Sequence, residues 1–266
     1  MSDRISVITA TCHAMVFLRR AINAMLAQDN QNWEMIVSPD DGGDYHSLEQ
    51  IDPRIRVVRS NAVRTGAGQA RNRGMAIATG TYVATLDDDD TVAPNFVGEV
   101  LAALKRHDVV TVPTKYVTET GEFIRTIGDT LPTMDIPTFS RELGSMHVIG
   151  QRNRHPTWQS CFAQDVLHTC ETIDRAGGSI HIVQSTRYNC TVRARSACMT
   201  RTDIDHEYGL LAEAGDSQLR MSSTGAAQTR ELFGYRRSIN ALFENRTESL
   251  LSMGYHQFVD AECLCL

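Results

Sequence analysis

The first 107 residues alternate between two hydrophobic periods, and this alternation constrains the fold more than any other feature of the chain. Short runs rich in β-branched and apolar residues, typical of buried strands, lie at 5–10, 35–37, 55–58 and 82–86. Apolar residues recur three and four positions apart, as on one face of a helix, at 18–26, 70–78 and, with Pro94 in the first turn, 97–104. A short polar helix or turn is expected at 47–51. This order predicts an α/β fold with a mostly parallel, doubly wound sheet and helices on both faces.

The pattern changes after Asp108. Two strand-like runs, 109–117 and 123–127, are separated by Thr120-Gly121 and predict a hairpin. An apolar stripe through Val166, Cys170 and Ile173 predicts a helix that ends at Gly177-Gly178. Two further strands are expected at 180–183 and 188–192, and the chain becomes helical and polar from about Thr202, with Gly and Ser interruptions near 215–225. We therefore divide the chain into a first half at 1–107, a smaller mixed half of the same domain at 108–201 and a helical tail at 202–266.

The tail contains one clear apolar stripe. It is formed by Leu232, Tyr235, Ile239, Leu242 and Phe243, within an expected helix at 230–243. Three interpretations stay open: the helix packs on the preceding domain, packs on a second copy of the chain in a homo-oligomer, or completes the monomer core.

Composition narrows the class of protein. The chain has 266 residues, is 42% hydrophobic and has a net charge of −6, which allows a sizeable core and gives no basic footprint for nucleic acid. Seven cysteines, of which only Cys12 lies in the first half, make a poor disulfide framework and suit a reducing compartment. No signal peptide and no apolar run of about 18 residues is visible, so a cytoplasmic protein without a transmembrane segment is expected. Peripheral membrane association stays open.

Four consecutive aspartates, Asp87 to Asp90, come directly after the strand that ends at Leu86. Adjacent carboxylates raise one another's pKa, and a divalent cation converts their repulsion into coordination. Mg²⁺ and Mn²⁺ prefer oxygen ligands, and open α/β sheets bind ligands at the carboxyl ends of their strands. The alternatives are a solvated acidic turn and a receiver-like phosphoacceptor domain. A receiver-like domain spreads its acids over two or three strands in a shorter chain.

Other strand ends converge on the same edge of the predicted sheet. The first strand ends at Thr11, the second at Asp40 and Asp41, and a segment with two glycines precedes the helix that carries Arg71. Asp40 or Asp41 can accept hydrogen bonds from a base or ribose, and a helix N-terminus with an arginine attracts phosphate. Taken singly, the aspartates fit an ordinary Asp-Gly turn and Arg71 a surface arginine.

Together these segments resemble the family 2 glycosyltransferases, which have the GT-A fold. The similar segments are Ile5 to Thr11, Leu26 to Asp29, Trp33 to Val37, Asp40-Asp41-Gly42-Gly43, Ala70-Arg71-Asn72-Arg73-Gly74 and the Leu-Asp-x-Asp-Asp metal motif at Leu86 to Asp90. The order and spacing agree over about the first 100 residues. The chain departs from the family at Pro39, which stands at the first acidic position of the turn, and at Cys12-His13, which replaces Tyr-Asn.

The resemblance implies roles for the matching residues. Thr11 and Asp40 would bind the nucleotide sugar, with Asp41 as the alternative to Asp40 at the base, and Arg71 would contact the base or the diphosphate. Asp87 would support the ribose or sugar, and Asp89 would bind the Mn²⁺ or Mg²⁺ cofactor. Asp88 belongs to the same donor-binding set, and which of the four carboxylates touch the ion stays open.

The resemblance is looser in the second half. Gln164-Asp165, a helix and Gly177-Gly178 resemble the family's Glu-Asp motif and the helix and glycines after it, with Gln in place of Glu. The aspartate of that motif is the general base of inverting members, so Asp165 is the candidate base. An N-cap of the adjoining helix is the alternative. Trp158 and His155 are candidates for the acceptor pocket, against a packed tryptophan and a surface histidine.

The sequence thus predicts a metal-dependent glycosyltransferase of the hexosyltransferase class, active in polysaccharide biosynthesis. It would move a sugar from a nucleotide sugar, by default a UDP-sugar, to a carbohydrate or other hydroxyl acceptor, with inversion. One alternative is a nucleotidyltransferase that makes sugar nucleotides, whose Gly-rich basic signature after the first strand is absent here. The other is a non-catalytic nucleotide-sugar-binding protein.

Overall fold

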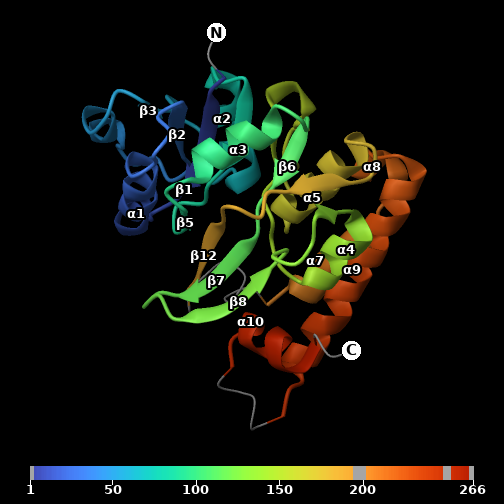
Figure 1. Ribbon diagram of the computed structural model, residues 1–266. Helices are drawn as coiled ribbons and strands as arrows, with labels where there is room; N and C mark the ends of the chain where they lie inside the picture. Colours follow the sequence, from blue (N-terminus) through green and yellow to red (C-terminus); the bar gives the residue numbers. More distant parts are fainter. Residues whose placement is uncertain (1–2, 194–201, 248–252, 264–266) are drawn as a thin grey trace.

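The main sheet has eight strands in the order β3-β2-β1-β4-β10-β6-β11-β9. Strands β1, β2, β3 and β6 of this sheet are labelled in Figure 1. The computed structural model describes residues 3–193, 202–247 and 253–263. Pairs β1/β2, β2/β3, β1/β4 and β6/β11 are parallel, while β10 and β9 run antiparallel to their neighbours. The strands are β1 (Ile5–Thr11), β2 (Trp33–Pro39), β3 (Ile55–Val57), β4 (Tyr82–Thr85), β6 (Val109–Thr111), β9 (Thr133–Met134), β10 (Ile149–Gln151) and β11 (Ile180–Ile182). The expected mostly parallel sheet is confirmed.

Helices cover both faces of the first half of this sheet. Helices α1 (Met15–Leu26) and α3 (Phe96–Leu104) and the 3₁₀ turn η1 (His46–Gln50) pack on the face that contains Val7, whereas α2 (Ala67–Ile77) contacts the opposite face through Ile8. Successive residues of a strand point to opposite faces, so the apolar run of β1 is buried on both sides. Helix α3 begins at Phe96 after Asn95. Pro94 therefore precedes the helix, and its expected place in the first turn is wrong.

A smaller mixed sheet has the order β5-β12-β7-β8, with β5 (Thr91–Val92), β12 (Tyr188–Val192), β7 (Thr114–Thr118) and β8 (Phe123–Ile127). Strands β7 and β8 form the expected hairpin. The single strand expected at 109–117 is wrong, because β6 belongs to the main sheet and β7 to the smaller one. The chain changes sheets at Pro113, which has no N–H for a ladder and whose carbonyl accepts a hydrogen bond from the Tyr188 amide at 3.0 Å.

Five helices enclose a second core: α4 (Ile136–Glu142), α5 (Gln164–Arg175), α7 (Ile204–Ala212), α8 (Asp216–Leu219) and α9 (Ser223–Glu244). Helices α10 (Tyr255–Phe258) and η4 (Val259–Cys263) pack on the end of α9 in a smaller cluster, and the short η2 (Arg152–Arg154) has no buried residue. Helix α5 ends before Gly177 and Gly178, both with φ near +90°, as expected for a glycine cap. None of the helices within the described ranges is long and apolar enough to cross a membrane.

Helix α9 runs along the outer side of this second core (Figure 1). It contacts α4, α5 and α7, and it buries Leu232, Phe233 and Ile239. Leu242, at the far end of the predicted stripe, is 51% exposed. Helix α9 therefore packs on the preceding domain, through α4 and α5, and completes the core of its own chain, while packing on a second copy stays a prediction.

Candidate active site

The ends of three neighbouring strands bring the predicted donor-site residues to one edge of the main sheet. Strands β1, β2 and β4 are parallel and adjacent, so Thr11, Asp40 and Asp87 lie at their carboxyl ends. The Asp40 amide donates to the Thr11 carbonyl at 2.9 Å, and the Cys12 amide donates to Oδ2 of Asp88 at 3.4 Å. The convergence expected from the sequence is therefore present.

Asp90 differs from the three aspartates before it. Its side chain is buried, and its two oxygens accept hydrogen bonds from the Tyr188 hydroxyl and the Thr191 amide, both at 2.7 Å. Burial, together with the charges of Asp89 and Asp87, raises its pKa well above the ordinary value. Asp90 thus anchors β12 beside β5, and neither carboxylate oxygen is left for a ligand.

Asp87, Asp88 and Asp89 line the open edge, and each faces a different neighbour. Asp87 forms an ion pair with Arg71, Asp88 lies against Thr11 and the Cys12 amide, and Asp89 forms an ion pair with Arg193 at 2.6 Å. Burial works against the charge of Asp87, but Arg71 and His147 hold its pKa below the usual range. Burial and the neighbouring carboxylates raise the pKa of Asp88 to about 6, and burial and Asp87 raise that of Asp89.

These carboxylates fit a divalent cation of the Mg²⁺ or Mn²⁺ type. Two crowded aspartates with raised pKa values form a site of excess negative charge made of oxygen donors. Because the three carboxylates diverge, one or two of them can touch a single ion, and the remaining ligands would come from water or a substrate phosphate. Mg²⁺ is bound in this way in many phosphate-transferring sites.

Arg71 is the buried cation of the site. It comes from the first turns of α2 and is 4% exposed. Its Nη2 pairs with Asp87, while Nε and Nη1 find no hydrogen-bond partner among the residues that the structure describes. Asp165 lies close enough to add to the electrostatic stabilisation of the Arg71 cation. A buried guanidinium with unused donors is costly unless an acceptor arrives, so Arg71 fits an anionic or polar ligand.

Asp40 and Asp41 are both engaged by the protein. Asp40 accepts from the Thr65 hydroxyl at 2.6 Å, from Arg73 at 2.7 Å and from the Gly66 amide at 2.7 Å, which fixes the loop before α2. Burial opposes the ionisation of its carboxylate, but these hydrogen bonds hold its pKa low.

Asp41 is held by a different set of donors. It accepts from the His13 amide at 2.7 Å, the Tyr45 hydroxyl at 2.7 Å and the Gly43 amide at 2.9 Å, and its pKa is also low in spite of burial. The Asp-Gly turn is thus a rigid part of this edge of the sheet.

Asp165 is the second residue of α5, and its Oδ2 accepts a hydrogen bond from the Ser145 hydroxyl at 2.8 Å. The N-cap of α5 is Ala163, whose side chain makes no capping bond, so the interpretation of Asp165 as an N-cap is wrong. Asp165 is close enough to influence the pKa of both Arg71 and His147. The structure therefore brings the candidate base of the second half to the donor-side edge.

The segment 157–160 packs on α2, the helix that carries Arg71. Asn72 exchanges two hydrogen bonds of 2.9 Å with the backbone of Trp158. A Cβ at Gly68 would lie 2.7 Å from the Gln159 carbonyl, so only glycine permits this approach. Trp158 is buried and stacked on His168 with ring centroids 4.0 Å apart, which confirms the packed tryptophan. His155 is buried as well, so its interpretation as a surface histidine is wrong.

Sequence reasoning missed four residues of this edge. They are Ser145, His147, Tyr188 and Arg193. His147 is buried, bonds to the Thr85 hydroxyl at 3.1 Å and lies 3.9 Å from Asp87, and burial lowers its pKa. All four come from segments far from the aspartates in sequence, and no periodicity or spacing connects them.

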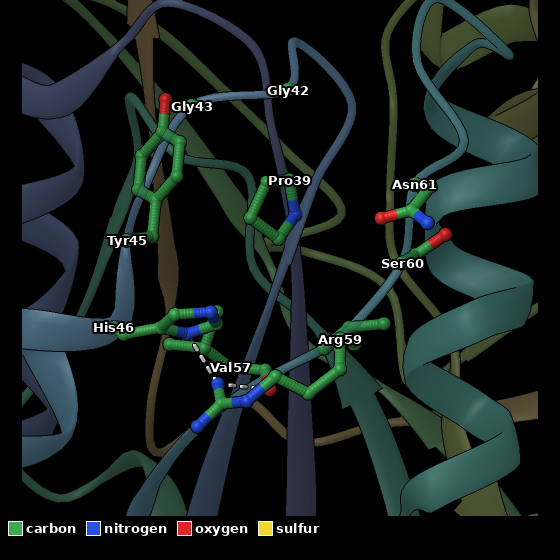
Figure 2. Close-up of a pocket in the computed structure, with 10 residues that line it drawn as sticks. Pro39, Gly42, Gly43, Tyr45, His46, Val57, Arg59, Ser60 and Asn61 are labelled. Atoms are coloured by element: carbon green, nitrogen blue, oxygen red, sulfur yellow. Dashed lines mark hydrogen bonds between the residues drawn. The ribbon is translucent and has the colours of Figure 1, made fainter.

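A pocket of about 420 Å³ lies at the ends of β2 and β3 (Figure 2). Gly42 and Gly43 lie at one end, Tyr45 and His46 on one side, and Ser60 and Asn61 on the other; Arg59 bonds to His46 near the opposite end. Thr11, Arg71 and the aspartates at 87–90 do not line it. The pocket thus adjoins the edge that carries these residues through the Pro39–Gly43 turn, but it is a separate space.

The fold and this edge define an α/β protein equipped for an anionic ligand beside crowded carboxylates. Comparison with known families is more specific: the model of Glycosyl transferase family 2 matches residues 6–209. The chain therefore belongs to glycosyl transferase family 2.

Relatives and solved structures agree with this assignment. The chain is 36% identical over 103 residues to the putative colanic acid biosynthesis glycosyl transferase WcaA of Escherichia coli (strain K12). The aligned residues make up 37% of this chain and 37% of that one. It is 35% identical over 89 residues to the UDP-Glc:alpha-D-GlcNAc-diphosphoundecaprenol beta-1,3-glucosyltransferase WfgD of Escherichia coli, covering 32% of this chain and 35% of that one. The matches thus span about a third of these relatives.

The crystal structure of S. aureus TarS 1–349 in complex with UDP-GlcNAc superposes with a TM-score of 0.65, at 16% identity, over 93% of this chain and 77% of that one. This similarity confirms the GT-A-type fold.

Proposed function

We propose that this protein is a metal-dependent, inverting glycosyltransferase that moves a sugar from a nucleotide sugar to an acceptor hydroxyl. The observation that supports this most is the state of Arg71, which is buried, pairs with Asp87, is stabilised by the charge of Asp165, and has two nitrogens, Nε and Nη1, without a hydrogen-bond partner among the described residues. A buried guanidinium of this kind would offer positive charge to a diphosphate, and the nearby Asp165 would offer a carboxylate to an acceptor hydroxyl. The residues assigned to the site are Thr11, Asp40, Asp41, Arg71, Asp87, Asp88, Asp89 and Asp165.

The donor side of the proposal uses the strand ends. Thr11 and the Asp40–Asp41 turn border the nucleoside. Each of the two carboxylates already accepts three hydrogen bonds from the protein, so Asp40 and Asp41 stay alternatives for the contact with the base. Arg71 donates to the diphosphate, and Asp87 orients Arg71 while bordering the ribose or sugar.

Asp89, with Asp88 beside it, would hold Mn²⁺ or Mg²⁺. When bound, such an ion supplies positive charge that stabilises the departing nucleoside diphosphate. Arg193 balances the charge of Asp89 through the 2.6 Å ion pair.

Asp165 is the proposed general base. It takes the proton of the acceptor hydroxyl as the oxygen forms a bond to the anomeric carbon, and the bond from that carbon to the diphosphate oxygen breaks. The electron pair leaves with the nucleoside diphosphate, whose charge Arg71 partly neutralises. Ser145 fixes the carboxylate through its 2.8 Å hydrogen bond and so keeps it oriented for this transfer.

The proposal extends to substrates and to the division of labour in the chain. A UDP-sugar is the first donor to test, since the name of WfgD specifies UDP-Glc and TarS was crystallised with UDP-GlcNAc. A carbohydrate acceptor in polysaccharide biosynthesis fits the name of WcaA. Residues 1–107 would bind the donor, 108–201 the acceptor, and 202–266 would support the acceptor half.

Release of nucleoside diphosphate from a panel of nucleotide sugars tests this function. We expect release with at least one donor in Mn²⁺, and loss of release in excess chelator or in Asp89→Asn. A rise in melting temperature without any release would indicate a non-catalytic binder, since binding alone stabilises the folded state. Full turnover in chelator would contradict the metal requirement.

A further inference from the structure

A thiol, an imidazole and a carboxylate meet where β1 and β2 end. Within the described part of the chain, one set of at least three candidate ligands has its atoms all within 4.8 Å of one another: Cys12, His13 and Asp41. The Cys12 amide donates to Asp88 at 3.4 Å, so the cluster adjoins the proposed site of the catalytic ion, but the reaction described above uses neither the Cys12 thiol nor the His13 ring.

The backbone holds the three groups together. His13 has a φ of 55°, a left-handed conformation that is uncommon outside glycine, and its amide donates to Asp41 at 2.7 Å. This turn brings Nδ1 of His13 to 3.3 Å from Oδ2 of Asp41. Asp41 itself is fixed by Tyr45 and Gly43, so one ligand is rigid, while the exposed Cys12 and the 71% exposed His13 are free to adjust.

We propose that Cys12, His13 and Asp41 form a binding site for a thiophilic divalent cation of the Zn²⁺ type. Sulfur, imidazole nitrogen and carboxylate oxygen are the ligands of zinc, and three protein ligands leave a fourth position for water. Ligand distances of about 2.0–2.3 Å place the ligand atoms about 3–4 Å from one another, so the present separations need only small side-chain rotations. Burial and the carboxylates of Asp41, Asp40 and Asp88 raise the pKa of the Cys12 thiol, so a cation that binds here must displace the thiol proton.

The position of the site gives it a consequence for the proposed function. Asp41 borders the proposed nucleoside position, so a cation bound here and a donor nucleotide compete for the same edge of the sheet. This consequence rests on the proposed function, whereas binding of the cation does not.

Titration of the reduced full-length chain with Co²⁺ tests the site, because a thiolate ligand gives Co²⁺ a charge-transfer absorption. We expect one equivalent to produce this absorption in the wild type, Cys12→Ser to abolish it, and His13→Ala to weaken cobalt binding about tenfold. Cys161→Ser is the matched thiol control and should keep the absorption, as should Asp89→Asn. Absence of the absorption in the wild type, or its persistence in Cys12→Ser, would overturn the proposal.

A second measurement tests the competition. Zn²⁺ should raise the KM for the donor in the wild type, with kcat at saturating donor unchanged, and should do so much less in Cys12→Ser, each compared with its own zinc-free value. An equal effect of Zn²⁺ on both proteins would overturn the competition. Because the cobalt absorption is read without substrate, it stands or falls independently of whether the protein transfers sugar.

Discussion

Ser145 places a hydroxyl on the carboxylate that we propose as the general base. Its Oγ donates to Asp165 at 2.8 Å, and its own amide donates to the Tyr116 hydroxyl at 2.7 Å. Arg236 of α9 donates to the carbonyl of the preceding Gly144 at 2.6 Å. A helix of the tail thus reaches the proposed base through two residues, which makes Ser145 a positioning residue.

Ser145→Ala should lower kcat about tenfold, since a hydrogen bond to a charged group contributes about 1.5–3 kcal/mol and here orients the base. Donor binding should not change, because Ser145 is on the acceptor side. Ser145→Thr retains the hydroxyl and should keep most of the activity. Steady-state kinetics of the three proteins, with donor affinity from a thermal-shift titration, checks this. An equal loss in the alanine and threonine variants would point to packing and away from the hydroxyl.

The sequence motifs place the aspartates of the site but do not determine the role of each one. The sequence places Asp87 to Asp90 at a strand end, and that placement is confirmed, but it does not distinguish them. The partners of Asp90, Tyr188 and Thr191 of β12, are 98 and 101 residues away in sequence, so only the tertiary structure shows that Asp90 is an anchor. Asp40 likewise fits a ligand-binding turn in sequence, yet its carboxylate is bound by Arg73 and the loop before α2.

At the scale of elements, the sequence predicted the long and strongly periodic ones. Strands β1 and β2 and helices α1, α2, α5 and α9 are all present, since their apolar patterns face large cores. Strands β5, β9 and β10 were missed because each has only two or three residues and no longer apolar run around it; β3 and β11 are as short but lie within the apolar runs 55–58 and 180–183. Helix α4 was missed for the same reason, because only Ile136 and Phe139 of its seven residues are fully buried.

Helix α9 provides a test of the supporting role of the tail. Phe233 is fully buried between α9 and the second core, and Phe233→Ala should cost about 3–5 kcal/mol of unfolding free energy. Leu242→Ala, on the same helix but 51% exposed, should change stability by no more than about 0.5 kcal/mol. Urea denaturation of both variants measures this difference. Equal, small effects would mean that α9 is an accessory to the fold.

At the scale of the whole molecule, the crowded carboxylates of the active edge lower the unfolding free energy. The pKa of Asp88 is raised to about 6 by burial and by the neighbouring aspartates. A carboxyl with a raised pKa in the folded state stabilises the fold while it is protonated, and that contribution is lost as the pH rises through the folded value. The folded protein therefore carries an electrostatic cost at neutral pH.

Asp88→Asn should remove this cost. Near pH 4 the variant and the wild type should have similar unfolding free energies, and near pH 7.5 the variant should be more stable by about 1–3 kcal/mol, less where solvent screens the charge. Urea unfolding of both proteins over this pH range checks the sign. A stability difference that does not vary with pH would contradict the raised pKa.

The account depends most on Asp165, and one comparison tests it directly. Asp165→Asn and Asp129→Asn make the same chemical change, the second at an exposed aspartate that is not one of the proposed site residues. With a donor that the wild type uses, in Mn²⁺, nucleoside diphosphate release should fall about 10²–10⁴-fold in Asp165→Asn and remain near the wild-type rate in Asp129→Asn, because asparagine cannot accept the acceptor's proton. Both variants should still bind the donor, as measured by thermal shift. Near-normal release by Asp165→Asn, with donor binding intact, would contradict the proposed mechanism.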